Sequence, residues 1–229
     1  MPLQLIEPDQ LWTAEMPLRL LGSDIGARMT VVRLPDGSLW VHSPIALTET
    51  LKRDLDALGP VRHLVSPSSW HYQHVAEFAR AYPAAKIYAS PASVKRLKAV
   101  GAVHPLSDEA EPGWNRALEQ ALFRGSRLYD EIDFYHAATR TLVLTDLCFH
   151  IPASSSWSTR LALGPLGIVG RFSPSASFHW TIRDRAAVVA SLQRILAWDF
   201  DRIILAHGEI VEREGRAAFR KAFGWLLGN

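Results

Sequence analysis

The fold of this chain is decided by the stretch Leu64-Val65-Ser66-Pro67-Ser68-Ser69-Trp70-His71-Tyr72-Gln73-His74. The apolar run 61–65 that leads into it predicts a short buried strand, and the polar cluster that follows predicts a loop. From His71 to Ala81, apolar residues recur at spacings of three and four, which predicts a helix. Two histidines are therefore expected where a strand ends and a helix begins, a common place for chemistry in layered α/β proteins.

The residue types available for a metal site are limited. His71 and His74 are three residues apart, so on a helix they share one face, but histidines at such positions are more often surface or packing residues than ligands. The single cysteine, Cys148, excludes an intramolecular disulfide and a cysteine-rich zinc site. Any metal would therefore be bound by His, Asp or Glu side chains from several parts of the chain.

The bulk composition is that of an ordinary globular protein. The chain has 229 residues, of which 48% are hydrophobic and 21% are charged. Neither a linker nor an internal repeat is visible, so residues 1–229 are predicted to form a single domain. With 25 Lys and Arg residues against 23 Asp and Glu residues, the formal net charge of +2 gives no general attraction to nucleic acid, and no such partner is expected.

The compartment is predicted from what the sequence lacks. The first residues do not show the basic and apolar regions of a signal peptide, and no stretch approaches the ~20 apolar residues of a membrane span. A chain with one cysteine also suits a reducing compartment. These features predict a cytoplasmic protein without a membrane partner. The sequence does not indicate an oligomeric state.

Strands alternate with helices along the chain. Two β-branched runs joined by Pro35-Asp36-Gly37 predict a hairpin over 29–34 and 38–42, and Thr48 is expected to cap a helix over 49–58. Residues 115–122 are predicted to be helical. Further strands are predicted at 86–89, 131–135, 141–145 and 201–206, and further helices at 184–198 and 213–227. This order predicts an α/β (α+β) fold in which helices cover both faces of the sheets.

Three ionisable side chains stand just past the ends of predicted apolar strands. They are His71, Asp146 and His207. If these strands are neighbours, all three side chains project to one edge of the sheet. Two imidazoles and a carboxylate suit Zn²⁺, Fe²⁺ or Mn²⁺. The alternative is that each residue merely caps the end of its strand.

The order of these elements resembles a known family. Hairpin, helix, strand, a loop with histidines, then Leu144-Thr145-Asp146 and Leu205-Ala206-His207-Gly208 resemble the metallo-β-lactamase superfamily over most of the chain. The resemblance implies a four-layer αβ/βα sandwich with a metal site at one edge of its two sheets. A closer similarity, to a small branch of that superfamily without an assigned function, is carried by residues 28–32, 39–44, 87–91 and 134–147.

The first metal-binding motif of the superfamily, His-x-His-x-Asp-His, is degenerate in this chain. It falls on residues 66–71, where Ser66 and Ser68 replace two histidines and Trp70 replaces the aspartate; only the last histidine is kept. The family's next histidine is also missing, because residues 125–128 contain none. Trp70 is expected to fill part of the space that the first metal would occupy.

The resemblance therefore leaves a reduced set of ligands. It implies that His71, Asp146 and His207 hold at most one ion, either Zn, Fe or Mn, with positions open for water or substrate. His74 is a weaker candidate for a fourth ligand or a supporting group, and Glu131 for a replacement of the missing histidine. His136 is expected to bond locally. Cys148 is expected to be a buried apolar residue.

Two functions remain open on this basis. One is a hydrolase with a single metal and an unknown small-molecule substrate, in which the Ser-, Gly- and Pro-rich segment 150–180 forms a lid over the pocket. The other is a catalytically silent, metal-free binding protein of the same fold. The serines and the tryptophan at ligand positions suit this second function.

Overall fold

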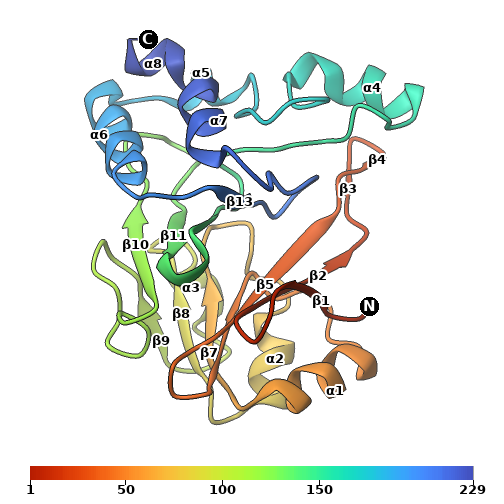
Figure 1. The fold of residues 1–229 in the computed structure, drawn as a ribbon, viewed down its shortest axis with the longest axis vertical. Coiled ribbons are helices and arrows are strands. Elements are labelled where there is room, and N and C mark those ends of the chain that lie inside the picture. The colour runs from red at the N-terminus through yellow and green to blue at the C-terminus, as the bar shows by residue number, and fades with distance from the viewer. Residues whose placement is uncertain (229) are drawn as a thin grey trace.

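The computed structural model describes residues 1–228 and contains two main sheets (Figure 1). The larger sheet has the strand order β1 (Gln4–Glu7), β2 (Leu11–Met16), β5 (Ala27–Arg33), β6 (Leu39–His42), β7 (Val61–Ser66), β8 (Lys86–Ala89) and β9 (Val103–Pro105). The smaller sheet has the order β10 (Leu118–Leu122), β11 (Ile132–His136), β12 (Thr141–Val143) and β13 (Arg202–Ile204). A short hairpin pairs β3 (Arg19–Leu20) with β4 (Ser23–Asp24).

Helices lie outside both sheets. They are α1 (Glu49–Leu58), α2 (Val75–Ala81), α3 (Val94–Leu97), α4 (Trp157–Leu163), α5 (Phe178–Thr181), α6 (Arg185–Leu196), α7 (Gly215–Ala222) and α8 (Gly224–Leu227). Short 3₁₀ turns occur at Ala137–Thr139 and Gly164–Leu166. Among residues 1–228, no helix has both the length and the apolar content that crossing a bilayer requires.

Three buried apolar clusters define the layers. One, which includes Leu51 and Phe78, packs α1 and α2 against the larger sheet. A second, which includes Trp40 and Phe134, lies between the two sheets. The third, which includes Leu192, packs α6 and α7 against the smaller sheet. The alternation of strand side chains supplies both faces of each sheet, so the predicted four-layer αβ/βα sandwich is confirmed (Figure 1).

Local signals predicted the hairpin of β5 and β6 and the helix α1 that follows it. β5 and β6 pair antiparallel, and Gly37 has the positive φ of 82° that the turn between them needs. Asp36 tightens this turn by accepting hydrogen bonds from both the backbone N–H and the hydroxyl of Ser38. Thr48 caps α1, its hydroxyl accepting from the Leu51 N–H. Each of these contacts lies within a few residues in sequence.

The prediction of a helix over 115–122 is wrong, because residues 118–122 form strand β10, which pairs antiparallel with β11. The buried Gln120 shows why: its side chain accepts from the Trp114 indole N–H and donates to the Ser107 carbonyl. These partners exist only in the folded loop before the strand. Tertiary pairing therefore outweighed local propensity here.

Segment 150–180 is more structured than a lid made only of loop. It holds α4, a 3₁₀ turn and α5, and its Leu163 and Ile168 form a small apolar cluster with Phe149, which directly precedes the segment. Ile25 from the β4 region joins this cluster. The segment is therefore anchored to the edge of the larger sheet.

A buried histidine in the sheet makes the stability depend on pH. His63 on β7 is 9% exposed, its Nδ1 has no hydrogen-bond partner, and its ring packs edge-on against Trp114. Burial lowers the pKa of His63 below its ordinary value of 6.5, although Asp36 acts in the opposite direction. The unfolded chain therefore takes up this proton first as the pH falls. The stabilisation is complete above about pH 6.5 and is lost below it, by at most about 1.4 kcal/mol per pH unit.

We therefore expect the free energy of unfolding to fall less in the His63→Leu variant than in the wild type when the pH is lowered from 7.5 to 5. Urea unfolding at each pH measures this, because the difference between wild type and variant isolates the histidine. The exposed His104→Leu on β9 is the matched control and should keep the wild-type pH dependence. Parallel pH profiles for wild type and His63→Leu would contradict the assignment.

Candidate metal centre

His71 lies in the loop after β7, held by contacts that oppose helix formation. The predicted helix start at residue 71 is wrong, because α2 begins only at Val75. The Ser68 hydroxyl accepts from the Trp70 N–H, and the Ser68 carbonyl accepts from the His71 N–H at 3.3 Å. Such local acceptors compete with the bonds of a first helical turn. His71 and His74 therefore do not share a helix face.

The other side of the His71 ring is fixed by Ser43. The Ser43 hydroxyl lies 2.5 Å from His71 Nδ1. Ser43 follows β6 directly and has a positive φ of 53°, which directs the chain from the strand toward the site. This contact leaves Nε2 as the nitrogen that faces the interior of the site.

Asp146 is positioned by a buried carboxylate. Both oxygens of Glu131, which is fully buried, accept backbone N–H groups: Oε1 from Thr145 at 3.0 Å and Oε2 from Asp146 at 2.7 Å. Glu131 therefore does not take the ligand position that the sequence offered it. It holds the loop after β12 so that the Asp146 side chain points into the site.

His207 follows β13 on a loop that is tied to the other sheet. Its Nδ1 donates to the Gly26 carbonyl at 2.6 Å, and its ring stacks on Phe149 with centroids 5.5 Å apart. Gly208 comes next with a positive φ of 87° and passes so close to the His150 carbonyl that no Cβ would fit. Glycine is therefore required at this turn.

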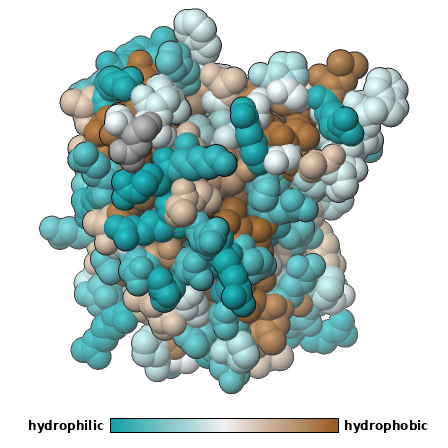
Figure 2. Space-filling model, turned by 45° about the horizontal axis from the view of Figure 1, so that its top comes forward, coloured by the Kyte–Doolittle hydropathy of each residue, from teal (hydrophilic) through white to brown (hydrophobic). Residues whose placement is uncertain are grey.

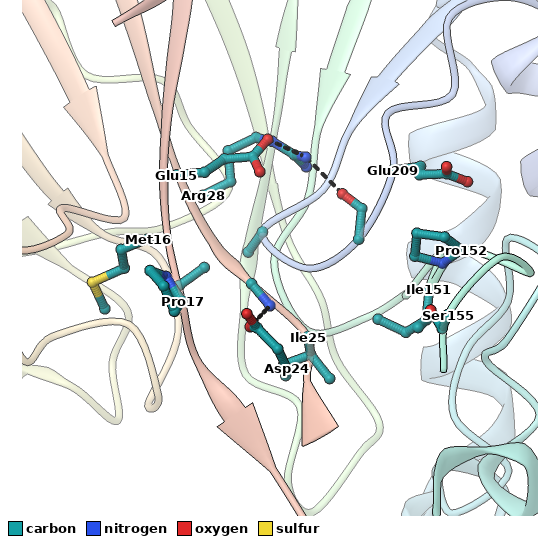
Figure 3. A pocket seen from close by; sticks show the side chains of 14 residues that line it. Glu15, Met16, Pro17, Asp24, Ile25, Arg28, Ile151, Pro152, Ser155 and Glu209 are labelled. Atoms are coloured by element: carbon teal, nitrogen blue, oxygen red, sulfur yellow. Dashed lines mark hydrogen bonds and ion pairs between the residues drawn. The ribbon is translucent and has the colours of Figure 1, made fainter. Parts of the chain in front are cut away.

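Arg28 of β5 secures the same loop. Its side chain donates to the Glu15 carboxylate (Figure 3) and to the carbonyls of Leu205 and Gly208. A hollow of about 560 Å³ lies beside this loop. Its lining includes Asp24 and Glu209, which are labelled in Figure 3. Arg28 is itself 6% exposed. It thus links the edge of the larger sheet to the segment that carries His207.

The structure brings the three predicted side chains together. His71 Nε2 lies 3.4 Å from Oδ1 and 3.3 Å from Oδ2 of Asp146. His207 Nε2 lies 3.4 Å from Asp146 Oδ1. One potential ligand atom from each residue lies within 4.8 Å of the others, and all three residues are buried. They come from three strand ends on two sheets.

The donor set fits a metal ion. The Gly26 carbonyl can only accept, so His207 Nδ1 carries a hydrogen and Nε2 of the neutral ring holds a lone pair. That lone pair faces a carboxylate oxygen, and two acceptors at this separation need a shared cation between them. Ligand atoms about 2.1 Å from a tetrahedral ion lie about 3.4 Å apart, which matches the distances between Asp146 and each imidazole.

The charges at this site depend on one another. Burial alone would raise the pKa of Asp146, but His71 and His207 hold it well below its ordinary range. Burial alone would lower the pKa of His71, but the Asp146 carboxylate raises it overall. The site therefore holds a carboxylate and favours a positive charge between its rings, supplied by a proton or by a metal ion.

The remaining candidates lie outside this cluster. His74 Nδ1 lies 3.2 Å from the Glu77 carboxylate at the start of α2. His136 bonds locally with the Thr139 hydroxyl at 2.8 Å, as predicted. Cys148 is fully buried, which confirms the prediction of an apolar role. None of these side chains joins the group of His71, Asp146 and His207.

The degenerate motif is arranged differently from the expectation. Trp70 is 56% exposed and stands at the wall of the pocket, so the prediction that it fills the space of a first metal is wrong. The buried Ser68 hydroxyl instead donates to Asp146 Oδ2 at 2.9 Å. Ser66 is also buried, and its hydroxyl has no partner. Nothing in the sequence showed that the tryptophan would turn outward.

A pocket of about 410 Å³ opens above the three residues. Its walls are mostly apolar, with Met16, Leu20, Ile25, Leu128 and Phe149 among them. Within residues 1–228, no Lys or Arg side chain lines this pocket. Its ionisable lining groups are His71, His74, Tyr129, Asp146 and His207. A mostly apolar pocket with a few polar groups is the usual arrangement of a small-molecule site.

The two hydrogen bonds that Glu131 accepts can be tested by measuring the stability of a Glu131→Gln variant. Glu131→Gln replaces one accepting oxygen with an NH₂ group, which cannot accept from the backbone. One N–H of residues 145–146 is then left unpaired in a buried place, and the free energy of unfolding should fall by about 1–3 kcal/mol. Urea unfolding measures this. The exposed Glu109→Gln is the matched control, and an equally small effect of both changes would refute the role of Glu131.

Comparisons with known proteins bear on the family and the fold of this chain. A family model described as "Domain of unknown function (DUF4336)" matches residues 8–178. A metallo-β-lactamase from Pontibacter korlensis is similar in structure, with a TM-score of 0.64 and 13% identity, covering 99% of each chain. The metal-soaked flavodiiron core of Flv1 from Synechocystis sp. PCC6803 has a TM-score of 0.67 and 12% identity, covering 99% of this chain and 60% of that one.

A third solved structure is described as a peroxy diiron species of the chemotaxis sensor ODP. It has a TM-score of 0.65 and 13% identity, covering 98% of this chain and 94% of that chain. A search of curated protein sequences gave no match. At these identities the likeness shows the fold.

Proposed function

Because the chain belongs to the DUF4336 family and has the metallo-β-lactamase fold, we propose that it is a mononuclear metal-dependent hydrolase. His71, Asp146 and His207 would hold one Zn, Fe or Mn ion. The observation that supports this most is that two imidazole Nε2 atoms face one buried carboxylate at 3.3–3.4 Å. Such an ion supplies Lewis acidity, which lowers the pKa of water toward neutrality and polarises a carbonyl group.

The chain's own residues prepare this site. Ser43 and the Gly26 carbonyl orient the two rings from behind, and supporting partners of this kind raise the affinity of a metal site. Glu131 holds the backbone of Asp146. Ser66 and Ser68 stand where a first metal would need imidazoles, so we propose one ion and not two.

The pocket favours an uncharged substrate. Its wall is apolar and, within the described residues, free of Lys and Arg, so a carboxylate or phosphate on the substrate would be buried without a partner. A small neutral ester, lactone or amide with an apolar body fits this environment. Trp70 and Leu128, both exposed by more than half, stand at the wall of this pocket.

A specific observation also supports a metal-free binding protein of the same fold. The Ser68 hydroxyl already donates to Asp146 Oδ2, and protons on the two imidazoles would satisfy the rest of the carboxylate. In that case the pocket binds its ligand without chemistry.

Elemental analysis of protein purified without chelators separates the two functions. If the protein is the proposed hydrolase, it should contain about one equivalent of Zn, Fe or Mn. It should also hydrolyse neutral nitrophenyl esters faster than anionic ones, and a chelator should abolish this activity. A metal content near zero, with no rebinding of added zinc, would leave the metal-free binding protein.

A further inference from the structure

The end of the molecule that carries α4, α5 and α8 exposes large apolar side chains. Trp180 is 82% exposed, Trp157 76% and Leu161 70%, the three highest values for large apolar side chains within residues 1–228. Trp157 and Leu161 are four residues apart on α4 and so lie on one face of that helix. Trp225 on α8 is 42% exposed. Apolar groups gathered at one end of a molecule mark an interaction surface.

These side chains belong to neighbouring elements. The His179 ring, next to Trp180, lies 4.9 Å from the Trp225 ring. Trp225 and Leu166 line one hollow of about 590 Å³, and Leu166 belongs to the turn that directly follows α4. Figure 1 places α4, α5, α7 and α8 at the same end of the molecule, and Figure 2 turns that end forward, with brown and pale side chains among teal ones.

The same elements concentrate positive charge. Residues 150–189 and 215–228 together carry seven Lys and Arg residues and one acidic residue, Asp184. Because the whole chain has 25 basic and 23 acidic residues, the remainder carries 18 and 22 and is net negative. All seven basic residues of these segments are exposed: Arg160, Arg171, Arg183, Arg185, Arg216, Arg220 and Lys221. The net charge of +2 thus conceals a strong asymmetry.

We propose that this end, here called the basic aromatic face (residues 157–185 and 216–225), docks peripherally on a bilayer of anionic lipid. Tryptophan places an apolar ring and a polar N–H in the interface between headgroups and acyl chains, and exposed Lys and Arg are attracted to anionic headgroups. The absence of a spanning segment, from which the sequence predicted no membrane partner, does not bear on docking of this kind.

Charge argues against a second copy of the chain as the occupant. A symmetric dimer would place this face against itself and oppose seven cations on each side, which is repulsive. Flat anionic headgroups are complementary to it. Exposed aliphatic and indole groups on α4 would in turn enter the bilayer interface, as in other interfacial helices.

The basic aromatic face adjoins the pocket of the metal centre. Ala162 and Leu163 of α4 belong to the cluster that contains Leu20 and Ile25, and both of these residues also line the pocket. Docking would therefore bring an apolar pocket close to apolar molecules dissolved in the bilayer. The docking itself does not depend on the proposed hydrolase activity.

Co-sedimentation of the purified full chain with vesicles tests the proposal. We expect binding to vesicles of phosphatidylcholine with about 30% phosphatidylserine, weak binding to pure phosphatidylcholine, and loss of binding at high salt. The double variant Trp157→Ser/Leu161→Ser should bind at least about 10-fold more weakly. Leu5→Ser, which replaces a residue 59% exposed on β1, is the matched control and should bind as the wild type does.

A second pair of variants tests the charge. Arg220→Gln/Lys221→Gln should weaken binding to anionic vesicles, whereas Lys95→Gln/Lys98→Gln, exposed on and just after α3, should not. Thermal melts of every variant exclude unfolding as the cause. The proposal is overturned if the wild type does not bind anionic vesicles, or if neither Trp157→Ser/Leu161→Ser nor Arg220→Gln/Lys221→Gln changes the binding. It is also overturned if light scattering shows a stable dimer that Trp157→Ser/Leu161→Ser dissociates.

Discussion

Replacing His207 with alanine is expected to lower the affinity for zinc by at least about 100-fold. Losing a group that only supports a ligand already costs about 10- to 100-fold, and His207 is one of three proposed ligands. Its ring is held by the Gly26 carbonyl and stacked on Phe149, and this orientation points its Nε2 at Asp146. Titration calorimetry with zinc measures the change.

His136→Ala is the matched control for this variant. His136 is 3% exposed and bonds only with Thr139 nearby, so its removal should leave zinc affinity unchanged. Urea unfolding of both variants shows whether the fold is kept. Unchanged zinc affinity in His207→Ala would remove the proposed site, and equal losses in both variants would attribute the effect to stability.

Arg28→Met is expected to lower the free energy of unfolding by about 3 kcal/mol. Methionine keeps the apolar stem of the side chain but removes every side-chain donor, so the carbonyls of Leu205 and Gly208 lose their partners. Each buried polar group left unpaired costs about 1–3 kcal/mol. Glu15, 43% exposed, can be solvated again and adds little.

Urea unfolding at pH 7 measures this loss, with Lys52→Met as the control. Lys52 pairs with Asp56 on the surface of α1, where both side chains are well exposed, and the change there should stay within about 0.5 kcal/mol. The Arg28 variant should also bind zinc more weakly, because the loop that carries His207 loses its anchor. Equal stability of the two variants would show that Arg28 does not hold that loop.

Much of the fold could be predicted because its signals are local. The turn at Gly37 and the cap at Thr48 involve contacts within three residues, and the buried strands are short apolar runs. The positions of His71, Asp146 and His207 were also predictable, since each follows such a strand. Their approach to within 4.8 Å required two sheets to meet at one edge.

Contacts that form only in the folded chain decided what the sequence did not show. Strand β10 forms where a helix was predicted, because Gln120 finds partners at Ser107 and Trp114. His71 lies in a loop because Ser68 captures the backbone around it. The supporting groups Ser43, Gly26 and Arg28 carry no mark in the sequence, since their partners are 28 to 181 residues away.

The sequence by itself thus determined the layers, the strand ends and which ionisable residues stand at them, because burial and turn chemistry depend on neighbouring residues. The tertiary structure alone decided which nitrogen of each histidine faces Asp146, where Trp70 points and that the positive charge gathers at one end. These features depend on which atoms come into contact across the two sheets. The free energy of such contacts cannot be read from any single stretch of the sequence.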